Sequence, residues 1–152
     1  MKVVSVARQA EALADAVERA LPGWVERSVE RVAAGAGRRA GPDLAAAARA
    51  VGREAGHEVA QAVRDRLSGD VDGQATTPLT LVREAVRYPT EVLRAAGVPP
   101  AGRDEVRARL FPDDVYDLAP STLADVDPDL GSAGLAWGAA KAYEHLARRR
   151  QP

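Results

Sequence analysis

The residues best suited to chemistry are a glutamate and a histidine one helical turn apart, Glu54 and His57. The spacing Glu-x-x-His places both side chains on one face of a helix, where di-iron helical bundles use it as half of a metal site. A complete site needs a second such pair and two further glutamates. The other histidine, His145, has Ala142 three positions before it. We therefore expect no metal site and no cofactor.

Two aspartate-rich segments, 125–129 and 70–73, resemble the opening of a calcium-binding loop. An EF-hand loop requires glycine at its sixth position and glutamate at its twelfth. In the first segment these positions hold Leu130 and Ala136, and in the second, with Gly73 as the sixth position, the twelfth holds Leu79. The aspartates are better explained as capping and turn residues.

Other signatures of catalysis are also missing from the sequence. There is no cysteine, so disulfides, thiolate metal sites and cysteine nucleophiles are excluded. The sequence contains no nucleophile elbow, P-loop, dinucleotide fingerprint or HExxH motif. We expect a protein that is not an enzyme, and a small metal-dependent helical enzyme is the weakest of the alternatives.

The periodicity of the apolar residues predicts an all-α fold. In the first half, a helix is expected to end at Leu21 because Pro22 follows it, and a second to run from Pro22 to the glycine-rich segment 35–41. A third and longer helix is expected over residues 42–67. Two glycines inside it, Gly52 and Gly56, predict a close crossing with another helix.

The second half is divided into shorter helices by its prolines. Thr77 and Pro78 are expected to start a helix that Pro89 interrupts, with a kink or a new start at Thr90. A short helix is expected over residues 103–110. The closing helix is expected over residues 132–149. The residues expected to face the core are Val106 and Leu110 in the former and Leu135, Ala139, Ala142, Tyr143 and Leu146 in the latter.

These elements suggest a chain in two parts. Residues 1–69 are predicted to form an Ala-rich helical bundle or hairpin, residues 70–76 a linker, and residues 77–152 a compact Pro-rich helical subdomain. The subdomain contains the acidic segment, residues 111–131. Six aspartates and no basic residue lie between positions 113 and 130.

The acidic segment and the closing helix supply the predicted contact surface. Carboxylates beside aromatic side chains are suited to docking a basic partner protein, although the aromatic residues could instead hold the segment on the core. Trp137, next to Gly138, has the same two interpretations. The residues of the predicted surface are Phe111, Asp113, Asp114, Tyr116, Asp117 and Trp137.

The clustered arginines suggest an alternative function. The arginines Arg148, Arg149 and Arg150, with Arg38 and Arg39, could bind phosphate, which would make the protein a nucleic-acid-associated factor with the acidic segment as a mimic or autoinhibitor. The net charge of −1 favours the protein partner, because nucleic-acid-binding domains are usually basic. No apolar run is long enough to cross a membrane, and the first residues do not resemble a secretory signal, so we expect a cytoplasmic protein.

The composition and the second half of the chain indicate the kind of organism that the protein comes from. Asparagine and isoleucine are absent and nearly all basic residues are arginine, as expected from a high-GC bacterial genome. Residues 77–149, with Pro112-Asp-Asp114 and Trp137-Gly-Ala-Ala-Lys141, resemble an uncharacterised group of actinobacterial helical proteins. The resemblance implies no particular activity.

We therefore expect a non-enzymatic cytoplasmic protein that acts through protein–protein interaction or regulation. The Ala/Gly-rich helices offer a second mode of association, which is self-assembly into a homo-oligomer.

Overall fold

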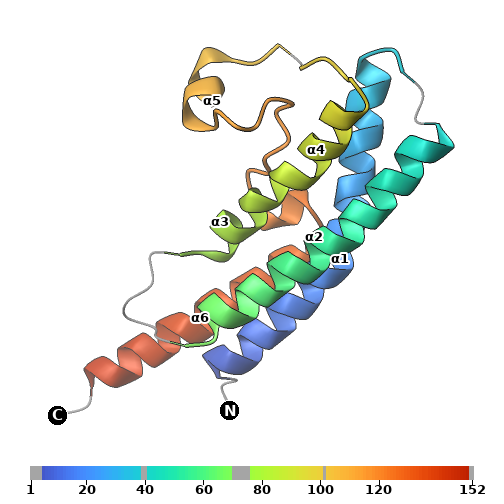
Figure 1. The fold of residues 1–152 in the computed structure, drawn as a ribbon. Coiled ribbons are helices and arrows are strands. Elements are labelled where there is room, and N and C mark those ends of the chain that lie inside the picture. Colours follow the sequence, from blue (N-terminus) through green and yellow to red (C-terminus); the bar gives the residue numbers. More distant parts are fainter. Residues whose placement is uncertain (1–4, 39–40, 70–75, 101, 151–152) are drawn as a thin grey trace.

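The computed structural model describes residues 5–38, 41–69, 76–100 and 102–150, and over these ranges it contains helices and no strand (Figure 1). The predicted all-α class is confirmed. The α-helices are α1 (Val6–Gly35), α2 (Pro42–Leu67), α3 (Pro78–Arg83), α4 (Arg87–Ala95), α5 (Glu105–Leu110) and α6 (Pro128–Arg149). Two 3₁₀ turns, η1 (Glu84–Val86) and η2 (Leu123–Asp125), precede α4 and α6.

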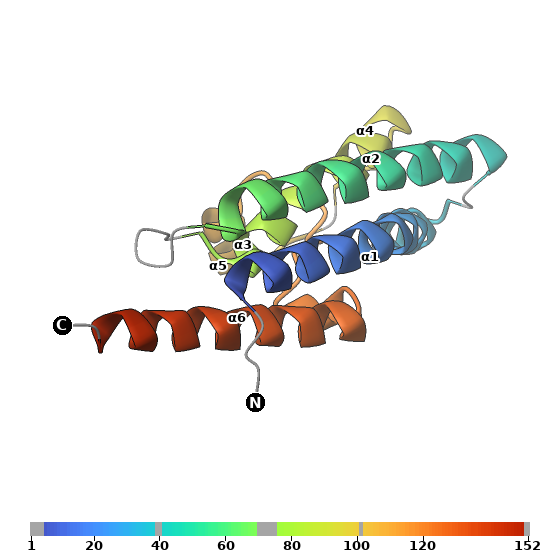
Figure 2. The ribbon, with the colours of Figure 1, turned by 90° about the horizontal axis from the view of Figure 1, so that it is seen from below.

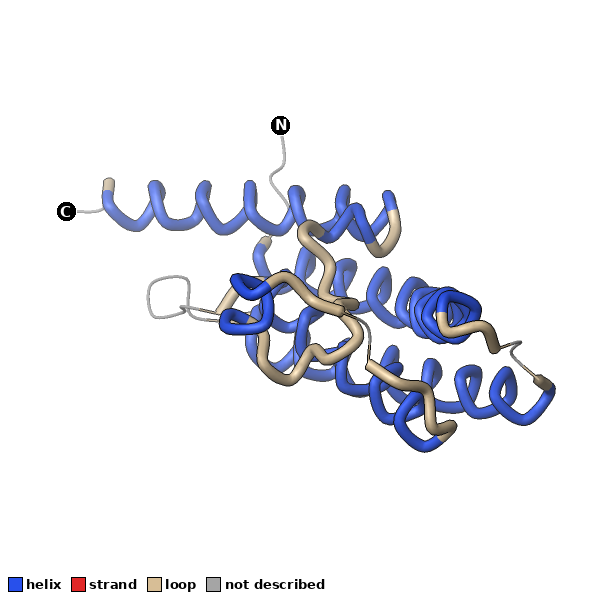
Figure 3. The backbone as a smooth tube through the Cα atoms, turned by 90° about the horizontal axis from the view of Figure 1, so that it is seen from above, coloured by secondary structure: helices blue, strands red, loops and turns tan. Residues whose placement is uncertain are grey.

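Helix α1 is the centre of the structure. It forms an antiparallel hairpin with α2, and α6 packs along its opposite side (Figure 2). Helix α4 contacts both α1 and α2. The irregular segments gather on one side of the helices, where they frame α5 (Figure 3).

A single hydrophobic core joins the two halves of the chain. It contains Leu21 of α1 and Val63 of α2, and also Leu81, Leu93 and Leu130 from the second half. The region 77–152 thus packs onto the hairpin and shares its core. Of the predicted linker 70–76, residues 70–75 lie outside the described ranges.

The expected end of the first helix at Leu21 is wrong, because α1 continues through Pro22 and is 30 residues long in total. A proline inside a helix removes one hydrogen bond and costs about 3 kcal/mol. The residues that follow keep the apolar stripe in phase, and Trp24, Val25 and Val29 are all buried. Each such side chain stabilises the fold by about 1.5–3 kcal/mol, so two or three of them offset the proline.

The predicted close helix crossing is confirmed, and it lies at Pro22. A Cβ atom on Gly52 would be 3.0 Å from both Cα and O of Pro22, and a Cβ atom on Gly56 would be 3.0 Å from the carbonyl oxygen of Glu18. Because Pro22 has no N–H, this carbonyl lacks its usual partner within α1. Only glycine at positions 52 and 56 lets α2 approach the proline turn this closely.

The proline-marked start of the second half is also confirmed, but the expected break is misplaced. Thr77 caps α3, accepting a hydrogen bond from the Thr80 N–H at 3.3 Å, and Pro78 occupies the first turn. The irregularity expected at Pro89 occurs earlier, at η1. Both Tyr88 and Pro89 lie in the first turn of α4, where the missing N–H of proline removes no internal hydrogen bond.

The inward face expected for the closing helix is wrong. Leu135, Tyr143 and Leu146 are 78%, 55% and 54% exposed, whereas Leu130, Trp137 and Ala140 are buried. Polar contacts explain this orientation of α6. The Trp137 indole N–H donates to the Leu67 carbonyl at 3.0 Å, at the end of α2, and the Glu144 carboxylate accepts the Val6 N–H at 3.1 Å, at the start of α1. A negative charge at a helix N-terminus is favourable.

None of the helices in the described ranges combines the length and the apolar character that a membrane span requires.

The Pro22 crossing yields a test of stability. We expect Gly56→Ala to lower the free energy of unfolding by about 1–3 kcal/mol, because the added methyl group forces the backbones of α1 and α2 apart. Gly138→Ala is the matched control, since a Cβ there meets nothing within 4 Å. This substitution should stabilise α6 by up to about 1 kcal/mol. Urea denaturation measures both effects, and equal stabilisation by the two substitutions would contradict the close crossing.

Candidate functional site

The first part of the acidic segment, residues 111–120, forms a strap that a buried carboxylate holds in shape. Asp114 is only 5% exposed. Its Oδ1 accepts the Leu118 N–H at 2.7 Å and its Oδ2 accepts the Ala119 N–H at 2.9 Å. Two charge-assisted bonds to the backbone fold the chain back on itself after Pro112. Asp114 is therefore used inside the strap and is not presented to a partner.

Other side chains fasten the strap to its surroundings through backbone carbonyls. The Tyr116 hydroxyl, which is buried, donates to the Val98 carbonyl at 2.6 Å. The Arg103 guanidinium donates to the carbonyls of Phe111 and Asp114 at 2.9 and 3.0 Å. Asp117 has a φ of 58° and forms an ion pair with Arg107.

Trp137 lies apart from the strap residues. It is 6% exposed, and the Lys141 ammonium group lies 5.1 Å from the centre of its ring. Of the six residues of the predicted contact surface, Asp114, Tyr116 and Trp137 are buried, while Phe111, Asp113 and Asp117 remain accessible. The three buried members are used in internal contacts of the fold, and the expected contact surface as a whole stays a prediction. Phe111 and Asp113 do lie together, beside a groove.

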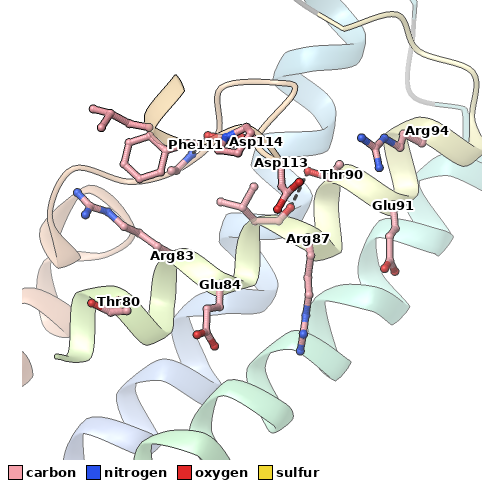
Figure 4. A pocket seen from close by; sticks show the side chains of 14 residues that line it. Thr80, Arg83, Glu84, Arg87, Thr90, Glu91, Arg94, Phe111, Asp113 and Asp114 are labelled. Carbon is pink, nitrogen blue, oxygen red and sulfur yellow. Dashed lines mark hydrogen bonds between the residues drawn. The ribbon is translucent and has the colours of Figure 1, made fainter. Parts of the chain in front are cut away.

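This groove, which we call the α4 groove, runs between the strap and the helical segment from α3 to α4 (Figure 4). It has a volume of about 640 Å³. On the strap side it is lined by Leu110, Phe111, Pro112, Asp113, Asp114 and Ala119. The helical side carries alternating charges and two threonines, namely Thr80, Arg83, Glu84, Arg87, Thr90, Glu91 and Arg94.

The Phe111 ring at the edge of the groove is held between two arginines. The guanidinium groups of Arg83 and Arg107 lie 5.5 and 5.9 Å from the centre of the ring, within the range of cation–π attraction. The Arg83 Nε also donates to the Pro120 carbonyl at 3.0 Å, which fixes its position. An aromatic side chain held in place and still partly exposed is suited to contact another molecule.

The helical wall of the groove is tied to α2 by a polar cluster. Tyr88 donates a hydrogen bond to the Glu58 carboxylate, and Arg87 donates to the Tyr88 hydroxyl at 3.0 Å. Burial raises the pKa of Tyr88 above its usual value, and the bond to Glu58 raises it further. The hydrogen bond to Tyr88 raises the pKa of Arg87. These bonds make this wall a fixed surface.

The short helix α5 shows that the expected burial of Val106 and Leu110 is wrong. These side chains are 53% and 66% exposed. None of the six residues of α5, all within the described ranges, is buried. A helix as short as α5 cannot bury its own two large apolar side chains. Its short length was therefore a signal in the sequence that Val106 and Leu110 would remain exposed. Leu110 and Phe111 thus form an apolar rim on the α4 groove, and the exposed Val106 lies one helical turn before Leu110 on α5.

The residues considered for metal binding have structural roles or are dispersed. His57 lies 3.7 Å from the Glu18 carboxylate and is largely exposed. Asp125 forms a capping box with Thr122, and Asp127 caps α6, as expected for capping aspartates. Within the described ranges, no three His, Cys, Asp or Glu side chains gather in a way that could hold a metal ion. The segment 70–73 lies outside those ranges.

The arginines considered for nucleic acid do not form one surface. Arg38 lies at the end of the hairpin and donates to the Ala96 carbonyl at 2.7 Å, whereas Arg149 and Arg150 lie at the opposite end of the molecule, at the C-terminus of α6 (Figure 1). Arg39 lies outside the described residues.

The strap provides a second test. We expect Asp114→Ala to lower the free energy of unfolding by about 2–3 kcal/mol, because it leaves two N–H groups without an acceptor. Asp113→Ala removes the same charge from an exposed neighbour and should change stability by less than about 0.5 kcal/mol. Urea denaturation distinguishes them. A similar effect for both variants would mean that Asp114 does not hold the strap.

Comparison with known proteins adds no further assignment: no protein-family model, curated protein or solved structure matches the chain at a significant level.

Proposed function

We propose that the protein is a non-enzymatic interaction protein that binds a segment of another protein at the α4 groove and its apolar rim. The proposal rests on the exposure of the apolar rim. Leu110, which is 66% exposed, and the partly exposed Phe111 line an open groove, and Val106, which is 53% exposed, lies one helical turn before Leu110 on α5. Contiguous exposed apolar residues with polar surroundings are typical of protein interaction sites.

The construction of the rim supports this role. Helix α5 is connected to the rest of the fold by segments fastened through hydrogen bonds, and its own large side chains contribute little to the core. Elements with few buried contacts open easily, and binding surfaces are commonly drawn from them. The groove wall opposite the rim is fixed to α2 through Tyr88 and Glu58. The exposed helix α5 beside a fixed wall can therefore adjust to a partner segment.

The charges and apolar residues of the groove indicate which kind of partner segment would fit it. The sequence favoured a basic partner, but the structure uses Asp114 internally and pairs Asp117 with Arg107. Asp113 shares the groove with Arg83, Arg87 and Arg94 and with two glutamates. An amphipathic segment with apolar residues for the rim and charges of both signs for the α4 wall fits this surface better than a uniformly basic one.

Site-specific photocrosslinking in the native host tests the proposal. A photoreactive amino acid in place of Leu110 should capture a discrete partner, whereas the same group in place of the exposed Arg19 on α1 should not. With the partner identified, Leu110→Asp should weaken its binding at least about tenfold, because a charge then enters the apolar contact.

The control for this experiment is Leu146→Asp, which places the same charge on an equally exposed leucine of α6 and should leave the partner's affinity unchanged. Identical crosslinks from positions 110 and 19, or equal losses of affinity with both aspartate variants, would contradict the assignment of the groove.

A further inference from the structure

The solvent face of α6 carries a narrow stripe of apolar residues. Leu135, Ala139, Ala142 and Leu146 follow one another at intervals of four, three and four residues, and all four are exposed. This is the spacing by which one helix packs along another in a coiled coil. Large residues at the two ends and alanines at the centre would allow a second helix to approach closely.

No described part of the chain covers this stripe. Two views of the molecule show α6 at one edge of the fold, with its C-terminal part extending beyond the α1–α2 hairpin (Figures 2 and 3). Residues 145–150 are all exposed. A second helix packed along this exposed face would stabilise the end of α6.

The charges at the two ends of α6 are complementary to those of a second, antiparallel copy of the same helix. Asp127 and Asp129 lie at its N-terminal end, and Arg149 and Arg150 at its C-terminal end. If two copies of α6 pack antiparallel, each acidic end lies beside the basic end of the other copy. If they pack in parallel, like charges meet at both ends, which is unfavourable.

We infer that the protein forms a symmetric dimer in which α6 packs antiparallel against α6 of a second copy. A two-fold axis midway between Ala139 and Ala142 places Leu135 beside Leu146 of the second copy and the alanines of the two copies beside each other. Each leucine of the stripe then meets a leucine of the second copy and each alanine meets an alanine. The surface is therefore self-complementary, as a two-fold interface requires. This interface is separate from the α4 groove and does not depend on the function proposed for it.

Sedimentation velocity over a range of concentrations tests the dimer. The wild-type protein should change from a species of 16.0 kDa to one of twice that mass as its concentration rises. Leu146→Asp and Ala142→Glu should each weaken dimerisation at least about tenfold. Leu110→Asp, the same kind of change on α5, should leave it unaltered. Both residues changed in α6 are exposed, so folding, monitored by circular dichroism, should persist.

Disulfide trapping tests the orientation, since the natural chain has no cysteine. A mixture of Ser132→Cys and Arg149→Cys variants should yield crosslinks between unlike chains, because the two-fold axis between Ala139 and Ala142 places position 132 beside position 149 of the second copy. Crosslinks formed mainly between like chains would overturn the antiparallel arrangement. A wild-type protein that stays at 16.0 kDa up to hundreds of micromolar, or a dimer unaffected by Leu146→Asp, would overturn the inference itself.

Discussion

The close crossing of α1 and α2 at Pro22 is the constraint on which the rest of the fold depends. A proline in the middle of a 30-residue helix leaves one carbonyl without its partner, and Gly52 and Gly56 bring the backbone of α2 directly against that turn. The chain is rich in alanine, which buries little area per residue. Close approach of the two backbones therefore replaces large side chains as the means of packing the hairpin.

The parts of the chain outside the hairpin share its hydrophobic core and are also fastened by side-chain donors that reach backbone carbonyls. Trp137 binds the end of α2, Tyr116 binds the carbonyl of Val98, and Arg27 of α1 binds that of Val126 at 3.1 Å. Such bonds fix irregular segments in place beside the apolar residues that they bury, such as Tyr116 and Leu118. The largest exposed apolar side chains gather on α5 and α6, the two elements for which we propose contacts with other chains.

The sequence predicted those features that depend on local chemistry. The all-α class, the cap at Thr77, the capping aspartates and the glycine crossing all follow from residue types and spacing. It failed where tertiary contacts decide the outcome. The continuous apolar stripe across Pro22 could have indicated a single helix, but the local penalty of proline favoured a break. For α6, residue size favoured burying Leu135 and Tyr143, whereas the partners of Trp137 and Glu144 lie on elements far away in the sequence. For α5, the short length of the helix was a signal in the sequence that its apolar residues would remain exposed.

Native-state hydrogen exchange, residue by residue and at low protein concentration, tests this account most directly. If the Pro22 crossing anchors the fold, amides of α1 and α2 on either side of it should exchange only through global unfolding. Amides of α5 and of the end of α6 should exchange much faster, through local opening. Equal protection of α5 and the crossing, or faster exchange at the crossing, would contradict the account.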